Sequence, residues 1–205
     1  SYISVNQSLE HAGANLDTQV DISWIDSRKL EDEGAVEILE QFDGIIVPGA
    51  FGEGGSEGVI EAIRYARENK IPYLGLCYGM QMGVVEYARN VVGLADANSA
   101  ENDPDSPNAV IDIQFSQREI IEEGRYGGTM RLGGYVAALK RDSQVLALYE
   151  QTGRLEEDAW RISHLHQKPK EAFRLGVILE SEKAVIERHR HRYEVSPKYV
   201  DLLEE

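Results

Sequence analysis

Short apolar runs alternate with amphipathic segments along the first half of the chain. Apolar residues that recur every three to four positions indicate one face of a helix, and short apolar runs that stop at glycine or proline are typical of buried strands. The expected elements are a helix end at 4–11, a strand at 19–25, a helix at 30–41, a strand at 44–47, a helix at 56–69, a strand at 73–76 and a helix at 79–92. This alternation predicts an α/β fold, a doubly wound, mostly parallel sheet with crossover helices.

Two of the expected helices carry the clearest patterns. Ser56 stands where an N-cap is expected for the helix at 56–69, and Pro72 follows its end. The helix at 79–92 has a predicted apolar side made of Met80, Val84, Ala88 and Val91.

The periodicity weakens beyond Gly93. The later expected elements are a polar loop at 96–108, a strand at 109–113, a helical segment at 155–170, and β segments at 175–179 and 184–195. A doubly wound sheet normally opens on a central strand, whereas this chain opens on a helix, so we expect residues before Ser1.

Composition narrows the class of protein. The chain has 205 residues and 42% apolar content, which fits one domain. Its 36 acidic and 21 basic residues give a net charge of −15, which repels nucleic acid. One cysteine cannot form an internal disulfide, and no apolar stretch reaches the roughly 20 residues that cross a bilayer. We therefore expect a cytoplasmic protein that binds neither nucleic acid nor membrane.

The stretch Leu-Gly-Leu-Cys-Tyr-Gly around Cys77 predicts a strand that turns sharply into a helix. Such a nucleophile elbow is strained and closely packed, so it needs small residues two before and two after the nucleophile, and Gly75 and Gly79 supply them. The helix N-terminus would favour the thiolate, and the Tyr78 N–H would face an oxyanion. A buried structural thiol is the alternative interpretation.

A second turn, Pro48-Gly49-Ala50, closes the expected strand at 44–47. Open α/β sheets bind ligands at the carboxyl ends of their strands, so both turns are expected at the same cleft. Taken alone, this glycine turn is equally compatible with a phosphate cradle or a plain connection, although it lacks the Lys-Ser/Thr ending of a P-loop.

The two turns and the Cys-x-Gly-Met-Gln sequence together resemble the triad-type, class I glutamine amidotransferase domains. In those domains a cysteine attacks the side-chain amide of glutamine. Further stretches, in the same order, are similar to the glutaminase domain of the CTP synthase family and cover most of the chain. They are 66–75, 86–91, 96–99, 127–133 and 187–195.

The resemblance implies hydrolysis of L-glutamine through a thioester on Cys77. Glu101 would meet the α-ammonium of the substrate and Arg192 its α-carboxylate, which suits the charges of these side chains. The candidate substrate-binding residues are Gly49, Ala50, Tyr78, Gly79, Met80, Gln81, Glu101, Arg192 and Tyr193. No metal and no cofactor are implied for this domain, which spans 1–205.

The same resemblance implies a larger enzyme. Ammonia would pass to a synthetase domain that uses ATP and magnesium to aminate UTP to CTP, and that domain would precede Ser1. A homo-oligomer, by resemblance a tetramer, and activation by GTP are implied as well.

The chain departs from the family pattern at the catalytic base, a His followed by Pro and Glu. None of the five histidines has that context: His11, His164, His166, His189 and His191. We expect the natural chain to continue past Glu205 and this fragment to be inactive alone. Ala50 replaces a family glycine, Tyr78 replaces the usual Leu, and 149–182 is expected to be an inserted helical segment.

Three other hypotheses stay open. A glutaminase-like domain without chemistry would serve as a binding or regulatory module, and a cysteine peptidase would also use an elbow cysteine. The run Arg-His-Arg-His-Arg at 188–192 places two imidazoles on one face of a strand, which suits a metal, and arginines on the other face, which suit phosphate or RNA.

Overall fold

A computed structural model describes residues 2–31, 34–50, 54–113, 131–166 and 183–204. Contacts divide the chain into two compact units, the first made of Ser1–Arg118 and Tyr193–Glu205, the second of Glu119–Arg192.

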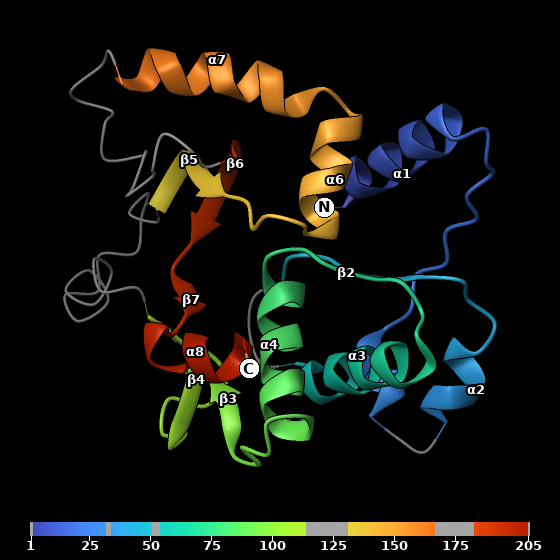
Figure 1. The fold of residues 1–205 in the computed structure, drawn as a ribbon. Helices are drawn as coiled ribbons and strands as arrows, with labels where there is room; N and C mark the ends of the chain where they lie inside the picture. Colours follow the sequence, from blue (N-terminus) through green and yellow to red (C-terminus); the bar gives the residue numbers. More distant parts are fainter. Residues whose placement is uncertain (1, 32–33, 51–53, 114–130, 167–182, 205) are drawn as a thin grey trace. The chain divides into compact units, whose positions relative to one another are not determined.

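The first unit alternates helices with short strands, as the sequence predicts (Figure 1). Its elements are α1 (Ile3–Asn15), η1 (Ser27–Leu30), α2 (Ala35–Leu39), β1 (Ile45–Val47), α3 (Ser56–Asn69), β2 (Tyr73–Gly75), α4 (Tyr78–Asn90), β3 (Ala97–Ser99), β4 (Asn108–Ile113), β7 (Tyr193–Val195), η3 (Pro197–Tyr199) and α8 (Val200–Glu204). The predictions at 44–47, 56–69, 73–76, 79–92 and 109–113 are confirmed to within one or two residues at each end.

Two small sheets organise this unit. Strands β1 and β2 pair in parallel, with Val47 opposite Gly75, so both strands end at the same edge. In the other sheet β3 pairs in parallel with β4, and β4 pairs antiparallel with β7. The parallel pair β1–β2 is joined through α3, and α4 connects β2 to β3, which confirms the α/β class.

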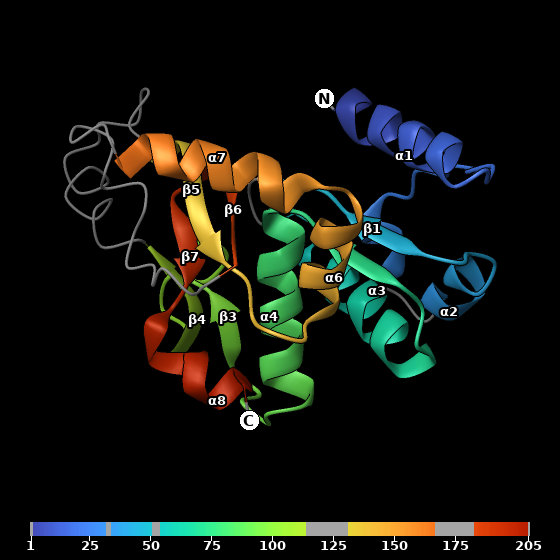
Figure 2. The same ribbon diagram turned by 45° about the horizontal axis from the view of Figure 1, so that its top comes forward.

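Helix α4 lies at the centre of the first unit, between α3 and the β3–β4 pair (Figures 1 and 2). Met82 and Val85 on α4 and Val110 and Ile111 on β4 are fully buried in one core cluster. A buried carboxylate, Glu86, accepts hydrogen bonds from both Nε and Nη2 of Arg67 of α3 and one from Asn90. Packing and this ion pair together hold α4 in place.

The observed burial of α4 corrects the predicted apolar side. Of the four residues expected on that side, Ala88 is buried, whereas Met80 and Val91 are exposed. The buried residues include Tyr78, Met82 and Val85. The helix is apolar on opposite faces, since 100° per residue places Met80 almost opposite Met82, and periodicity alone does not tell which face meets the core.

Three other local predictions are wrong. No strand forms at 19–25, and none of the described strands pairs with this segment, although its composition suits one. The helix expected at 30–41 is reduced to η1 and α2, with residues 32–33 outside the described ranges. The loop expected at 96–108 contains the strand β3, because Ala97 pairs with Asn108 in the parallel β3–β4 ladder.

The N-cap of α3 is also corrected. Ser56 is the first residue of the helix, and Gly55 stands at the N-cap with a φ of 84°. The positive φ favours glycine there, and a Cβ on Gly55 would collide with the Ser27 side chain.

The second unit pairs two strands beneath a helical segment. It comprises β5 (Arg131–Ala138), α6 (Gln144–Gln151), α7 (Arg154–His166) and β6 (Ala184–His191). Strands β5 and β6 are antiparallel from Arg131↔His191 to Ala138↔Ala184. The helix expected at 155–170 is confirmed as far as His166, and the strand at 184–195 is divided into β6 and β7. The β segment at 175–179 and most of 127–133 lie outside the described residues.

None of the helices described is both long enough and apolar enough to cross a membrane.

Candidate active site

Two turns meet where the parallel strands β1 and β2 end. The Leu76 N–H donates to the Val47 carbonyl oxygen at 2.9 Å, which continues the pairing of the two strands into their turns. A Cβ built on Gly49 would lie 3.4 Å from the Cys77 Cβ and 3.7 Å from its Sγ. The Pro48–Gly49 turn therefore packs directly against the cysteine, and the predicted convergence is confirmed.

Cys77 has the backbone conformation of a nucleophile elbow. Its φ is 55° and its ψ is −105°, a combination that a residue with a side chain adopts only under strain. It directly precedes α4, whose Gln81 N–H donates to the Cys77 carbonyl oxygen at 3.1 Å. Strain of this kind is typical of a site where a side chain must be presented to a ligand.

The flanking glycines are sterically required. A Cβ on Gly75 would lie 2.6 Å from the Gly79 carbonyl carbon, and a Cβ on Gly79 would lie 2.8 Å from the Val47 Cβ and overlap the Val47 carbonyl oxygen. Both distances are shorter than real Cβ contacts, so the sharp turn closes only with glycine at these two positions.

The environment of the thiol opposes ionisation. Burial raises the pKa of the Cys77 thiol, the backbone N–H of Tyr78 lowers it by hydrogen bonding, and the negative charge of Glu101 raises it further. The net direction is upward, because desolvation of the charged form exceeds the stabilisation from the Tyr78 N–H. The expectation that the helix N-terminus favours the thiolate stays a prediction.

Glu101 lies in a tight turn after β3. Its backbone N–H donates to the Ser99 hydroxyl at 3.2 Å, and the N–H of Asn102 donates to the Ser99 carbonyl oxygen at 3.0 Å. The Asn102 Nδ2 of the same turn lies 3.5 Å from the Tyr78 hydroxyl, so the turn lies against the start of α4, and the Glu101 charge raises the pKa of the Cys77 thiol.

Gln81 and Tyr193, two of the predicted substrate contacts, lie side by side. The Gln81 side-chain amide donates to the Tyr193 carbonyl oxygen at 2.8 Å, which ties α4 to β7. Only 4% of Gln81 is exposed, so this amide has a structural use in addition to any contact with a ligand.

The whole chain, residues 1–205, matches the family model described as glutamine amidotransferase class-I. The chain belongs to the class I glutamine amidotransferase family. It is 44% identical to the CTP synthase of Wolinella succinogenes over 100% of its own length and 33% of that protein. It is 45% identical to the CTP synthase of Carboxydothermus hydrogenoformans over 99% of its own length and 32% of that protein. The chain thus spans about a third of the curated relatives it matches.

A solved structure agrees with this family. The glutaminase domain of Trypanosoma brucei CTPS with bound acivicin matches with a TM-score of 0.76 and 34% identity, over 99% of this chain and 65% of that one. The predicted fold class and the predicted family are therefore confirmed. In this amidotransferase, the nucleophile elbow is the strained turn that carries Cys77.

Three further predicted substrate-binding residues of this amidotransferase lie in different parts of the fold. Ala50 packs against the core cluster. Its φ is not positive, since Ala50 is not one of the described non-glycine residues in that region, so its side chain causes no backbone strain. Arg192 belongs to the second compact unit and Tyr193 to the first. Only Tyr193 can therefore be placed against α4.

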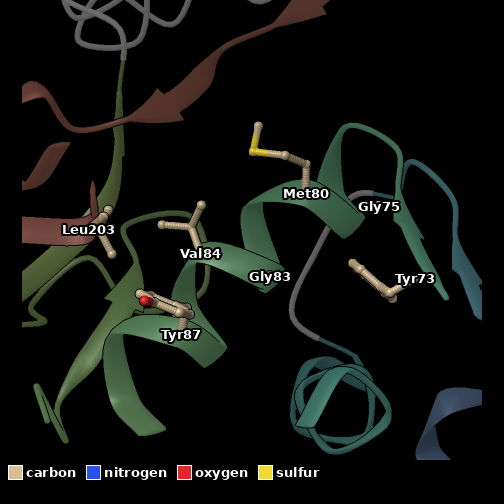
Figure 3. A pocket seen from close by; sticks show the side chains of 7 residues that line it. All are labelled: Tyr73, Gly75, Met80, Gly83, Val84, Tyr87 and Leu203. Atoms are coloured by element: carbon tan, nitrogen blue, oxygen red, sulfur yellow. The ribbon is translucent and has the colours of Figure 1, made fainter. Parts of the chain in front are cut away.

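Met80 points away from the core face of α4. It is 40% exposed and helps to line an apolar cavity of about 300 Å³ between α4, β2 and α8 (Figure 3). The cavity is lined by Tyr73, Gly75, Met80, Gly83, Val84, Tyr87 and Leu203. A role of the Met80 side chain toward substrate stays a prediction.

The histidines of the Arg-His-Arg-His-Arg run contact each other. The rings of His189 and His191 lie edge to face with centroids 5.5 Å apart, and His189 also meets Tyr135 at 5.3 Å. The described ranges contain no group of three or more His, Cys, Asp or Glu residues arranged to hold a metal ion.

Sequence reasoning assigned Tyr78 a role only through its backbone. The structure adds its side chain, whose hydroxyl lies 3.5 Å from the Asn102 Nδ2. The sequence could have predicted that a buried tyrosine hydroxyl at this position needs a polar partner. It could not have identified that partner, because the partner depends on the tertiary fold.

Proposed function

We propose that this domain hydrolyses L-glutamine through a covalent thioester on Cys77. The sulfur attacks the side-chain amide carbon and forms a C–S bond. The C–N bond then breaks, and the nitrogen leaves as ammonia with the proton that the Cys77 thiol gave up. Water then breaks the C–S bond, its hydroxyl going to glutamate and its proton back to the sulfur. The observation that carries the proposal is the strained conformation of Cys77 at a turn packed against Gly49.

Backbone donors at the two turns support the same chemistry. The N–H groups of Ala50 and Tyr78 are our candidates for stabilising the oxyanion of the tetrahedral intermediate. Each such donor contributes about 2.7–4 kcal/mol in a comparable site.

Substrate binding would relieve part of the penalty on the thiolate. We expect the α-ammonium of glutamine to pair with Glu101, whose negative charge raises the pKa of Cys77. Arg192 is our candidate for the α-carboxylate, with the Tyr193 backbone beside it. Gly49, Gly79, Met80 and Gln81 complete the proposed pocket.

The full protein would be a glutamine-hydrolysing CTP synthase of the cytoplasm. This part of the proposal is supported by the similarity to proteins named CTP synthase over the whole of this chain. Ammonia from the domain would aminate UTP in a synthetase domain that binds ATP and magnesium, in a homo-oligomer, by resemblance a tetramer, that responds to GTP. The glutaminase domain itself would need no cofactor.

A non-catalytic glutaminase-like module is the second candidate. It is favoured by the upward direction of the Cys77 pKa, because a thiol that keeps its proton is a poor nucleophile.

The experiment that separates the two candidates is covalent labelling of Cys77 with diazo-oxo-norleucine, a glutamine analogue, followed by mass spectrometry. We expect one adduct, located at Cys77, blocked by excess glutamine and missing in Cys77→Ser. An adduct that glutamine does not block would show an accessible thiol without a glutamine pocket. Neither that outcome nor a lack of labelling would be compatible with the proposal.

A further inference from the structure

The side chain of Tyr78 is buried beside the nucleophile, although the proposed function uses only its backbone. Tyr78 is 4% exposed, so its hydroxyl requires hydrogen-bond partners inside the protein. One partner is the Asn102 Nδ2, which lies 3.5 Å from the hydroxyl, and a second is the Ser56 side chain at the start of α3. The hydroxyl thus joins the elbow to two other elements of the first unit.

Asn102 belongs to the same tight turn as Glu101. The turn is held on one side by Ser99, which is fully buried and bonds the N–H groups of Glu101, Asn102 and Asp103. On its other side the Asn102 amide reaches α4, where its Nδ2 lies 3.5 Å from the Tyr78 hydroxyl and 3.7 Å from the Met82 Sδ. The position of Glu101 relative to α4 therefore depends on how Asn102 is held.

We propose that Tyr78 is a positioning residue whose hydroxyl, through Asn102, holds the Glu101 turn against the elbow and so sets the affinity for the α-ammonium of the substrate. The inference rests on the proposed glutaminase function. It assigns to the Tyr78 side chain a role that the usual Leu of the family cannot perform, since leucine has no hydroxyl.

A purely structural role predicts a different outcome. If Tyr78 only filled the core, its ring would matter and its hydroxyl would not. Tyr78→Phe keeps the ring and removes the hydroxyl, so this variant separates the two roles without opening a cavity.

The first test is the concentration dependence of Cys77 labelling by diazo-oxo-norleucine, which yields the half-saturating concentration KI and the maximal rate constant kinact. We expect Tyr78→Phe to raise KI by about 2- to 12-fold, the effect of one neutral hydrogen bond, with a smaller change in kinact. Asn102→Ala should raise KI similarly, and the double variant should do little more, because both changes break one link.

The matched control is Tyr87→Phe, which removes a hydroxyl from the same helix on the cavity face. It should leave KI and kinact at the wild-type values. The proposal is overturned if Tyr78→Phe behaves like this control, or if its effect falls on kinact instead of KI.

A second test needs no ligand. Amide hydrogen exchange at Glu101 and Asn102, whose N–H groups are bonded to Ser99, should be faster in Tyr78→Phe than in the wild type. Unchanged exchange would overturn the link between Tyr78 and the turn. Faster exchange in a protein that diazo-oxo-norleucine does not label would support the link and reject the proposed glutaminase.

Discussion

Cys77 combines a strained backbone with a thiol whose pKa is raised. The elbow geometry presents the sulfur beside the Gly49 turn, whereas burial and the Glu101 charge raise the pKa of the thiol. Catalytic cysteines usually sit in surroundings that lower the pKa, such as a neighbouring imidazolium. At this residue, activation therefore has to come from groups that join the site, including the bound substrate.

The pH dependence of alkylation tests this electrostatic reasoning. The Glu101 carboxylate disfavours the thiolate, so Glu101→Gln should lower the pKa of Cys77 and move the midpoint of the rate–pH curve to lower pH. The measurement is the rate of thiol alkylation by iodoacetamide across a pH series, and since Cys77 is the one cysteine, every thiol adduct reports on it.

Asp105→Asn is the control, because it removes one charge from an exposed position in the same loop. It should leave the midpoint in place. A midpoint that moves to higher pH in Glu101→Gln, or equal shifts in both variants, would contradict a local effect of Glu101.

At the scale of elements, α4 approaches β1 more closely than a side chain allows. Gly79 makes this contact against Val47, whereas Gly83, one turn along the same helix, has room. A Cβ on Gly83 would lie 3.7 Å from a ring carbon of Tyr73, which is an ordinary contact distance. The two glycines of one helix thus have opposite steric requirements.

Alanine substitutions should separate them. Gly79→Ala forces α4 away from β1, and we expect it to lower the free energy of unfolding by about 1–3 kcal/mol or more. Gly83→Ala adds a methyl group at an ordinary contact distance from the Tyr73 ring within a helix, so it should raise the free energy of unfolding by up to about 1 kcal/mol. Urea denaturation measures both, and similar losses for the two variants would argue against the tight contact at Gly79.

At the scale of the whole molecule, the second unit is stabilised by a buried carboxylate of its own. Asp158 of α7 is fully buried and accepts hydrogen bonds from the Ile186 N–H of β6 at 2.9 Å and from Arg154 at 3.0 Å, while Arg161 bonds its other oxygen at 3.2 Å. These bonds join the helical segment to β6 without any residue of the first unit.

Asp158→Ala should therefore destabilise the second unit selectively. Loss of three charge-assisted hydrogen bonds should cost roughly 3 kcal/mol, and amide exchange in β5 and β6 should become faster while α4 keeps its protection. Glu157→Ala removes an exposed carboxylate from the same helix and should cost less than about 1 kcal/mol. Equal loss of protection in α4 and β6 would mean that the two units open together.

The sequence by itself determined the elements with local causes. Gly75 and Gly79 flank Cys77 because the turn closes only without side chains, and the helix at 56–69 follows from its apolar periodicity. Steric limits on one turn and the repeat of one helix act between residues close in the chain, so they can be derived from the order of residues alone.

Only the tertiary structure decided the features that depend on distant partners. The segment at 19–25 has strand composition but no neighbouring strand among the described residues, and α4 has apolar residues on both sides, of which the core selects one. The same holds for the site. The pKa of Cys77 follows from burial and from Glu101, and Tyr78 meets Asn102 across 24 positions of sequence. Burial, pairing and long-range hydrogen bonds exist only once the chain has packed, so no local pattern encodes them.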